Sequence, residues 1–284
     1  MKNKKICIIG SGTMGAGIAQ VAAQSGMNVF LYDKDSNCID KGISIIEKNL
    51  QRAAEKGKIK IEDIDATLGR ISKTLKFEEC PNDMNFVIEA AVEDLMVKKS
   101  IFRQLDKKYS PVVILATNTS SLSVTEIASV TKKPDRVIGI HFFNPVQVMN
   151  LVEIVRGSKT SDDVFLKSKK FVEELGKTPI EVKDSPGFIV NRLLIPMINE
   201  AANILAQGIS SREDIDTAMK LGANYPIGPL ALADLIGLDV CLNIMQTLYN
   251  GFSDPKYKPS PLIINMVKAE LLGRKSKKGF YTYT

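Results

Sequence analysis

Histidine is almost missing from this chain: among 284 residues there is one, His141. Imidazole has an unperturbed pKa of about 6.5, so a protein that moves protons near neutral pH usually relies on this side chain. One candidate is therefore available for that chemistry. A lone histidine after a strand is more often a hydrogen-bonded structural group, so the neighbours of His141 must decide its role.

Cysteine is scarce as well, and the four residues lie far apart without a CxxC pair. With a single histidine they are too few for a metal site, so no metal is expected. Free thiols are typical of a reducing compartment, and we expect a cytoplasmic protein. The cysteines are Cys7, Cys38, Cys80 and Cys241.

Long apolar runs are absent too. No segment approaches the roughly 18 uncharged apolar residues of a membrane-spanning helix, so no membrane partner is expected. The basic residues 1–5 lead into a short apolar run without a cleavage site, which indicates a first strand rather than a signal peptide. The net charge of +6 comes from lysines spread along the whole chain, which indicates a solvated surface and predicts no nucleic-acid partner.

A glycine-rich turn follows the first apolar run, residues 6–9. Glycines between a strand and a helix permit a tight turn and let backbone N–H groups approach a pyrophosphate. After the helix a second strand, 29–32, ends at Asp33, near the spacing at which a carboxylate binds ribose hydroxyls. This order of strand, glycine turn, helix, strand and acid favours a dinucleotide site over a glycine turn with a merely structural role. Its predicted residues are Gly10, Gly12, Thr13, Met14, Gly15 and Asp33.

Asp33 also bears on the choice of cofactor. A carboxylate there would repel the 2′-phosphate of NADP, so NAD is favoured. Lys34 follows directly and softens this preference, which leaves NADP as the alternative cofactor.

Residues 36–69 have the pattern of two helices and are expected to form an arm inserted into the sheet domain. On one face Lys48, Arg52 and Lys56 recur every four residues. Like charges at that spacing repel by a few tenths of a kcal/mol, so the row favours an anion nearby. A solvated lysine face is an equal alternative.

The predicted sheet resumes in a series of short apolar runs. The polar cluster 117–122 lies at the carboxyl end of one run, where α/β sheets bind ligands, and His141 ends the next. Ser120 and His141 should therefore face one crevice. The runs are 86–89, 112–116, 137–140, 151–155 and 180–182, with helices expected at about 95–108 and 162–175.

One acid, Glu153, lies within the apolar run 151–155. A buried carboxylate is costly unless it is paired. If the chain turns back after Asn144-Pro145, Glu153 can pair with the imidazole of His141 and stabilise its cation. The lone histidine and the buried acid then explain each other.

After Asp184-Ser185-Pro186-Gly187 the periodicity becomes purely helical, which marks a domain boundary. Asn191, a polar residue in the first turn of the first helix, is expected to project back into the cleft. So much apolar surface on about 100 residues predicts that this half packs against a second copy. Helices are expected at about 188–207, 211–221, 229–249 and 261–272.

These features predict an α/β fold: a Rossmann-type dinucleotide-binding domain over 1–185 with the inserted arm, then an all-α domain over 186–284 for dimerisation and cleft closure. The motifs resemble, over nearly the whole length, the L-3-hydroxyacyl-CoA dehydrogenase family and, within it, the bacterial 3-hydroxybutyryl-CoA dehydrogenases. The markers are Gly10-Ser11-Gly12-Thr13-Met14-Gly15, Ala116-Thr117-Asn118-Thr119-Ser120-Ser121-Leu122, His141-Phe142-Phe143-Asn144-Pro145, Leu151-Val152-Glu153, Ser185-Pro186-Gly187-Phe188-Ile189-Val190-Asn191-Arg192 and Gly273-Arg274-Lys275 to Gly279-Phe280-Tyr281.

The resemblance implies a reversible hydride transfer between NAD(H) and the C3 oxygen position of a short acyl-CoA, with reduction of acetoacetyl-CoA to 3-hydroxybutyryl-CoA as in butyrate-forming fermentations. His141 would be the general acid/base and Glu153 its partner. Ser120 and Asn191 would bind the substrate oxygens. It further places Asn144 near the substrate, Glu93, Lys98 and Asn118 at the cofactor, and Arg52 and Lys56 near the coenzyme A phosphates.

Two positions depart from the family pattern. Tyr225-Pro226 stands where the family usually has His-Pro, so the proton transfer does not need that histidine. Lys277 stands where glycine is usual. Three alternatives remain: a broader-chain L-3-hydroxyacyl-CoA dehydrogenase of β-oxidation, a related enzyme that acts on free hydroxy acids, and a non-catalytic NAD-binding protein.

Overall fold

The computed structural model describes residues 4–284, so most of the basic start, Met1–Asn3, lies outside the described residues. The chain divides into two compact units, Met1–Asp184 and Ser185–Thr284. Each unit has its own apolar core.

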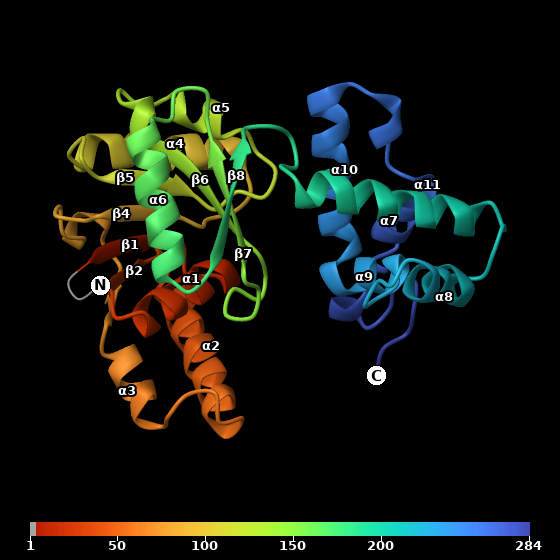
Figure 1. Ribbon diagram of the computed structural model, residues 1–284, viewed down its shortest axis with the longest axis horizontal. Helices are drawn as coiled ribbons and strands as arrows, with labels where there is room; N and C mark the ends of the chain where they lie inside the picture. Colours follow the sequence, from red (N-terminus) through yellow and green to blue (C-terminus); the bar gives the residue numbers. More distant parts are fainter. Residues whose placement is uncertain (1–3) are drawn as a thin grey trace. The chain divides into compact units, whose positions relative to one another are not determined.

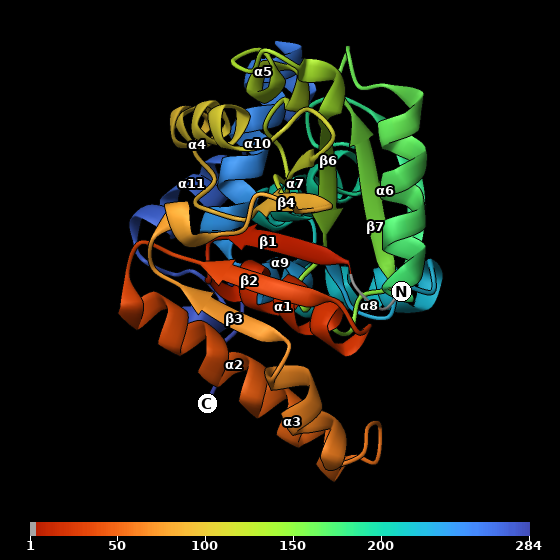
Figure 2. The ribbon, with the colours of Figure 1, turned by 90° about the vertical axis from the view of Figure 1, so that its left-hand side faces the viewer.

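The first unit is built on an eight-stranded sheet in the order β3-β2-β1-β4-β5-β6-β7-β8. All neighbouring strands are parallel except β6 and β7, which are antiparallel. Several strands are mostly apolar and buried along their whole length, as expected of a parallel sheet covered on both faces (Figures 1 and 2). The strands are β1 (Lys5–Ile9), β2 (Asn28–Tyr32), β3 (Ile71–Thr74), β4 (Phe86–Glu89), β5 (Ile114–Thr117), β6 (Val137–Phe142), β7 (Leu151–Arg156) and β8 (Thr178–Lys183).

The helices of this unit connect the parallel strands, and two of them form the expected arm. Figure 2 shows α2 and α3 extending together beyond the β3 edge of the sheet. The arm packs on α1, which starts at the glycine-rich turn. The helices are α1 (Thr13–Gln24), α2 (Ser36–Glu55), α3 (Glu62–Leu68), α4 (Leu95–Lys108), α5 (Val124–Ala128) and α6 (Asp162–Glu174), with 3-10 turns η1 (Phe77–Glu79) and η2 (Pro134–Arg136).

Two elements of this unit were not predicted from the sequence. β3 is an edge strand whose four residues include a single large apolar side chain, Ile71, and two exposed polar ones. α5 spans five residues, too few for a helical period to show. The predicted doubly wound α/β fold itself is confirmed.

The second unit is helical, and the prediction was wrong for one of its helices. The pattern predicted one helix over 229–249, but the structure has two, bent by 99° at Gly237, which adopts φ +104°. A side chain is strained in that region, so glycine permits the break. The elements are α7 (Val190–Ala206), α8 (Arg212–Gly222), α9 (Pro229–Ile236), α10 (Leu238–Phe252), η3 (Pro255–Tyr257), α11 (Pro261–Lys268) and η4 (Arg274–Ser276).

Within residues 4–284 no single helix has the length and apolar character needed to cross a membrane. The bent pair α9 and α10 meets that test only when the two helices are counted together.

Candidate active site

A pocket of about 750 Å³ opens at the carboxyl ends of β1, β2 and β4. This is the edge of a doubly wound sheet at which dinucleotides bind. Tyr32 and Phe77 contribute aromatic walls. Of the nine residues predicted at the cofactor, five also line it: Gly10, Gly12, Thr13, Met14 and Asp33.

The three glycines of the turn are needed for different reasons. A Cβ on Gly10 would lie 2.6 Å from the Ala90 carbonyl oxygen, and one on Gly15 would lie 1.8 Å from that of Gly10. At both positions the backbone packs too closely against other backbone atoms to leave room for a side chain. Gly12 instead faces open space, with no atom within 4 Å of a Cβ there. The backbone is thus bare on the side that a pyrophosphate would approach.

Asp33 lies in this pocket and is tied to the turn. Its Oδ2 accepts hydrogen bonds from the backbone N–H and the hydroxyl of Ser11, both at 2.9 Å. From the described residues, its Oδ1 accepts only a longer hydrogen bond of 3.4 Å, donated by the backbone N–H of Asp35. Oδ1 is therefore the atom suited to a ribose hydroxyl. The glycine turn and the acid fit the NAD that the sequence predicts.

His141 and Glu153 form a buried pair at the same edge of the sheet. The antiparallel register of β6 and β7 sets the two residues directly opposite each other. The His141 Nδ1 lies 2.7 Å from the Glu153 Oε2, and the carboxylate has no exposed surface. The chain turns back after Asn144-Pro145, and the predicted pairing of the lone histidine with the buried acid is confirmed.

Asn118 joins the ends of β5 and β6. Its side-chain amide oxygen accepts a hydrogen bond from the backbone N–H of Phe142 at 2.9 Å, and its backbone N–H donates to the Glu89 backbone carbonyl at 2.7 Å. The polar cluster after β5 and the strand that carries His141 are thereby held at one edge, as the sequence predicted.

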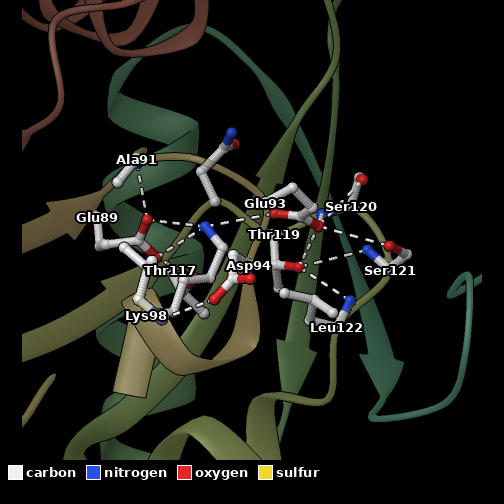
Figure 3. A network of polar contacts seen from close by, with 12 residues as sticks. Glu89, Ala91, Glu93, Asp94, Lys98, Thr117, Thr119, Ser120, Ser121 and Leu122 are labelled. Carbon is white, nitrogen blue, oxygen red and sulfur yellow. Dashed lines mark hydrogen bonds and ion pairs between the residues drawn. The ribbon is translucent and has the colours of Figure 1, made fainter. Parts of the chain in front are cut away.

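The Glu93 side chain accepts hydrogen bonds from several groups of the turn after β5 (Figure 3). Its Oε1 accepts hydrogen bonds from the Thr119 hydroxyl at 2.6 Å and from the Ser120 backbone N–H and hydroxyl at 2.8 and 3.2 Å. Its Oε2 faces Lys98 at 3.3 Å. Desolvation acts to raise the pKa of Glu93, but the charge of Lys98 and the hydrogen bonds of the turn outweigh it and hold that pKa below its usual range.

Lys98 also binds a second carboxylate, Glu89, and both side chains are fully buried. The ammonium lies 2.7 and 3.0 Å from the two oxygens of Glu89. Glu89 was not predicted from the sequence, although the rule that singled out Glu153 applies to it equally. It is the one acid in the apolar run 86–89, and a lysine follows nine residues later.

The other predicted residues lie outside the turn after β5. Asn144 is exposed in the turn after β6. Arg52 and Lys56 are exposed at the end of α2, with no carboxylate of the described residues at ion-pair distance. Asn191 is buried in the first turn of α7, in the second unit. Their roles stay predictions.

Among residues 4–284 no group of three or more histidine, cysteine or carboxylate side chains is arranged to hold a metal ion. The four cysteines are all free thiols.

Residues 5–185 match the family model of the 3-hydroxyacyl-CoA dehydrogenase NAD binding domain, and residues 187–283 match the C-terminal domain of the same family. The chain belongs to the 3-hydroxyacyl-CoA dehydrogenase family. The family and the NAD-binding domain predicted from the motifs are thus confirmed.

The chain is similar to several relatives over nearly its whole length. It is 52% identical to the 3-hydroxybutyryl-CoA dehydrogenase of Clostridioides difficile over 98% of this chain and 99% of that one. It is 43% identical to the human mitochondrial hydroxyacyl-coenzyme A dehydrogenase over 99% and 91%. The crystal structure of (S)-3-hydroxybutyryl-CoA dehydrogenase from Ralstonia eutropha matches with a TM-score of 0.95 at 47% identity, covering 99% of both chains.

Proposed function

We propose that this chain is an NAD-dependent 3-hydroxybutyryl-CoA dehydrogenase that interconverts acetoacetyl-CoA and 3-hydroxybutyryl-CoA. The observation that carries the proposal is the buried pair of His141 and Glu153, at 2.7 Å, at the carboxyl-end edge of a dinucleotide-binding sheet. Relatives of that name that match nearly the full chain at 47–52% identity support the acyl-CoA substrate.

His141 is the proton carrier of the proposed reaction. Its Nδ1 faces Glu153, so Nδ1–H is donated to the carboxylate and Nε2 exchanges the proton with the C3 oxygen. The carboxylate stabilises the imidazolium that forms when the hydroxyl is oxidised. In the reverse direction the same imidazolium returns the proton to the developing alkoxide.

NAD(H), when bound, accepts or supplies the hydride at C3. The turn from Gly10 to Gly15 would hold its pyrophosphate and Asp33 its adenosine ribose, while Glu93, Lys98 and Asn118 would support the nicotinamide end. Asp33 bears the charge that disfavours the 2′-phosphate of NADP.

Substrate binding is assigned to polar residues around the proton carrier. Ser120 and Asn191 would hydrogen-bond the C3 and thioester oxygens and fix the reacting carbon in place, with Asn144 close by. Arg52 and Lys56 on the arm would bind the phosphates of coenzyme A, since both are exposed cations at helix spacing.

We also propose a homodimer formed through the helices of the second unit. Large apolar side chains there are exposed in the single chain, among them Leu193 at 72% and Leu221 at 83%. Such surfaces usually mark contacts with another protein.

The test is the loss of NADH absorbance on addition of acetoacetyl-CoA, run beside NADPH and beside free acetoacetate. We expect turnover with NADH and acetoacetyl-CoA, slower turnover with NADPH, and little with the free acid. An Arg52→Ala/Lys56→Ala variant should raise the KM for acetoacetyl-CoA and leave kcat largely unchanged. No consumption of either cofactor with this or any longer 3-ketoacyl-CoA would contradict the proposal.

A further inference from the structure

We infer that Glu89 is a positioning residue of the reaction: through Lys98 and Glu93 it fixes the turn that carries Ser120. The inference rests on the proposed function, and it concerns a residue that lies one step behind the residues predicted to touch cofactor or substrate.

Glu89 is the last residue of β4 and has no exposed surface. Besides the two contacts with the Lys98 ammonium, its carboxylate accepts hydrogen bonds at 2.7 Å from the Ala91 N–H and the Thr117 hydroxyl (Figure 3). These partners lie in the loop after β4, in α4 and at the end of β5. One buried charge therefore ties together three segments around the cofactor pocket, which Ala91 itself lines.

Lys98 stands between two carboxylates. Its ammonium lies closer to Glu89, at 2.7 Å, than to Glu93, at 3.3 Å. A fully buried ammonium needs a counter-charge at close range. If Glu89 lost its charge, Glu93 would be the remaining carboxylate at Lys98, and electrostatic attraction would draw it toward the ammonium.

Glu93 cannot move toward Lys98 without consequence for Ser120. Oε2 faces the ammonium, while Oε1 holds the hydroxyl of Thr119 and both the N–H and the hydroxyl of Ser120. A shift of this carboxylate changes the direction of the Ser120 hydroxyl, and small displacements of a substrate-binding group are costly in rate. Glu89 thus sets the position of Ser120 by neutralising Lys98.

The decisive variant is Glu89→Gln, which preserves shape and removes charge. The amide oxygen can still accept from the Ala91 N–H and from Lys98, and the amide nitrogen can donate to the Thr117 hydroxyl. We expect kcat/KM for acetoacetyl-CoA to fall about tenfold or more, because a displaced Ser120 hydroxyl positions the substrate less well.

A double-mutant cycle separates action through Glu93 from general damage. If Glu89 acts through Glu93, the Glu89→Gln/Glu93→Gln variant should be no worse than Glu93→Gln alone, within about twofold. Single-variant losses that multiply in the double variant would overturn the inference, and so would a near-native kcat/KM for Glu89→Gln.

Asp106→Asn is the matched control. Asp106 also lies on α4 and forms a largely buried ion pair at 2.9 Å, with Arg136, outside the network of Figure 3. We expect this variant to lower the Tm and to leave kcat/KM within about twofold of the native value. An equal loss of kcat/KM in both variants, assayed well below every Tm, would show a merely structural role for Glu89.

The proposed function and this inference fail in different ways. The unaltered chain alone tests the function, by its turnover of acetoacetyl-CoA. Should it have none, NADH affinity measured by fluorescence becomes the readout of the same cycle, with the same expectation of non-additivity. If Glu89→Gln does not fold, Glu89→Asp replaces it in the cycle. The shorter side chain keeps the charge but moves it away from Lys98. Losses of Glu89→Asp and Glu93→Gln that multiply in the double variant would equally overturn the inference.

Discussion

Glu153 and Glu89 are two carboxylates in one sheet, each with no exposed surface, and the protein compensates them differently. Glu153 faces His141 across antiparallel strands. Glu89 faces Lys98, a threonine hydroxyl and a backbone N–H. An imidazole changes its charge near neutral pH, whereas the ammonium of lysine ordinarily does not. The first pair is therefore suited to move a proton, and the second to hold neighbouring groups in place.

The largest effect should follow from removing the proton carrier. His141→Ala should lower kcat by about 10³-fold or more, equivalent to about 4 kcal/mol, because no other histidine exists to replace it. Steady-state NADH consumption measures this. Near-native rates would assign His141 a structural role and move the proton transfer elsewhere.

Removing the side chain of Glu89 should have its largest effect on the stability of the fold. Glu89→Ala leaves the buried ammonium of Lys98 without its nearest counter-charge, and breaking a buried pair in this way costs about 3–5 kcal/mol. Urea denaturation gives the free energy of unfolding. A cost below about 1 kcal/mol would mean that Glu93 or water replaces Glu89 readily, and the contrast with Glu153 would weaken.

Neutralising the acid of the proton-transfer pair should have an intermediate effect on rate. Glu153→Gln keeps a hydrogen-bonding side chain opposite His141 but no longer stabilises the imidazolium, so kcat should fall about 100-fold. The matching Glu89→Gln variant should lose less. A larger loss in Glu89→Gln than in Glu153→Gln would reverse the roles assigned to the two pairs.

The smallest effect concerns pH. Because the pKa of Glu93 is held below its usual range, its charge stabilises the fold above about pH 4.3, and this contribution is lost as the pH falls through the lowered value. The difference in the free energy of unfolding between the native chain and Glu93→Gln should therefore narrow below about pH 4. Denaturation at a series of pH values measures it, and a constant difference would contradict this account.

The two carboxylates also show which parts of the candidate site can be predicted from the sequence. The lone histidine and the acid in an apolar strand predicted each other, because each is costly or unexplained alone. Glu89 was overlooked since its partner, Lys98, is one of many lysines, and nothing in their separation marks this one as buried. Hydrogen-bond partners such as the Thr117 hydroxyl depend on strand order, which single residues do not reveal.

The helices and strands likewise divide into those that the sequence pattern predicts and those that depend on tertiary structure. Strong apolar runs predicted the parallel strands, while β3 at the sheet edge lacked the pattern. The break at Gly237 was hidden because both α9 and α10 continue one apolar periodicity, and the conformation of a single glycine decides whether the helix continues.

The central claim is that one buried pair transfers the proton and the other only holds its surroundings. The solvent deuterium isotope effect on acetoacetyl-CoA reduction tests it most directly, measured for the native chain, Glu153→Gln and Glu89→Gln. We predict a larger isotope effect in Glu153→Gln, where proton transfer is slowed, and a native value in Glu89→Gln. An isotope effect raised equally in both variants, or only in Glu89→Gln, would contradict the account.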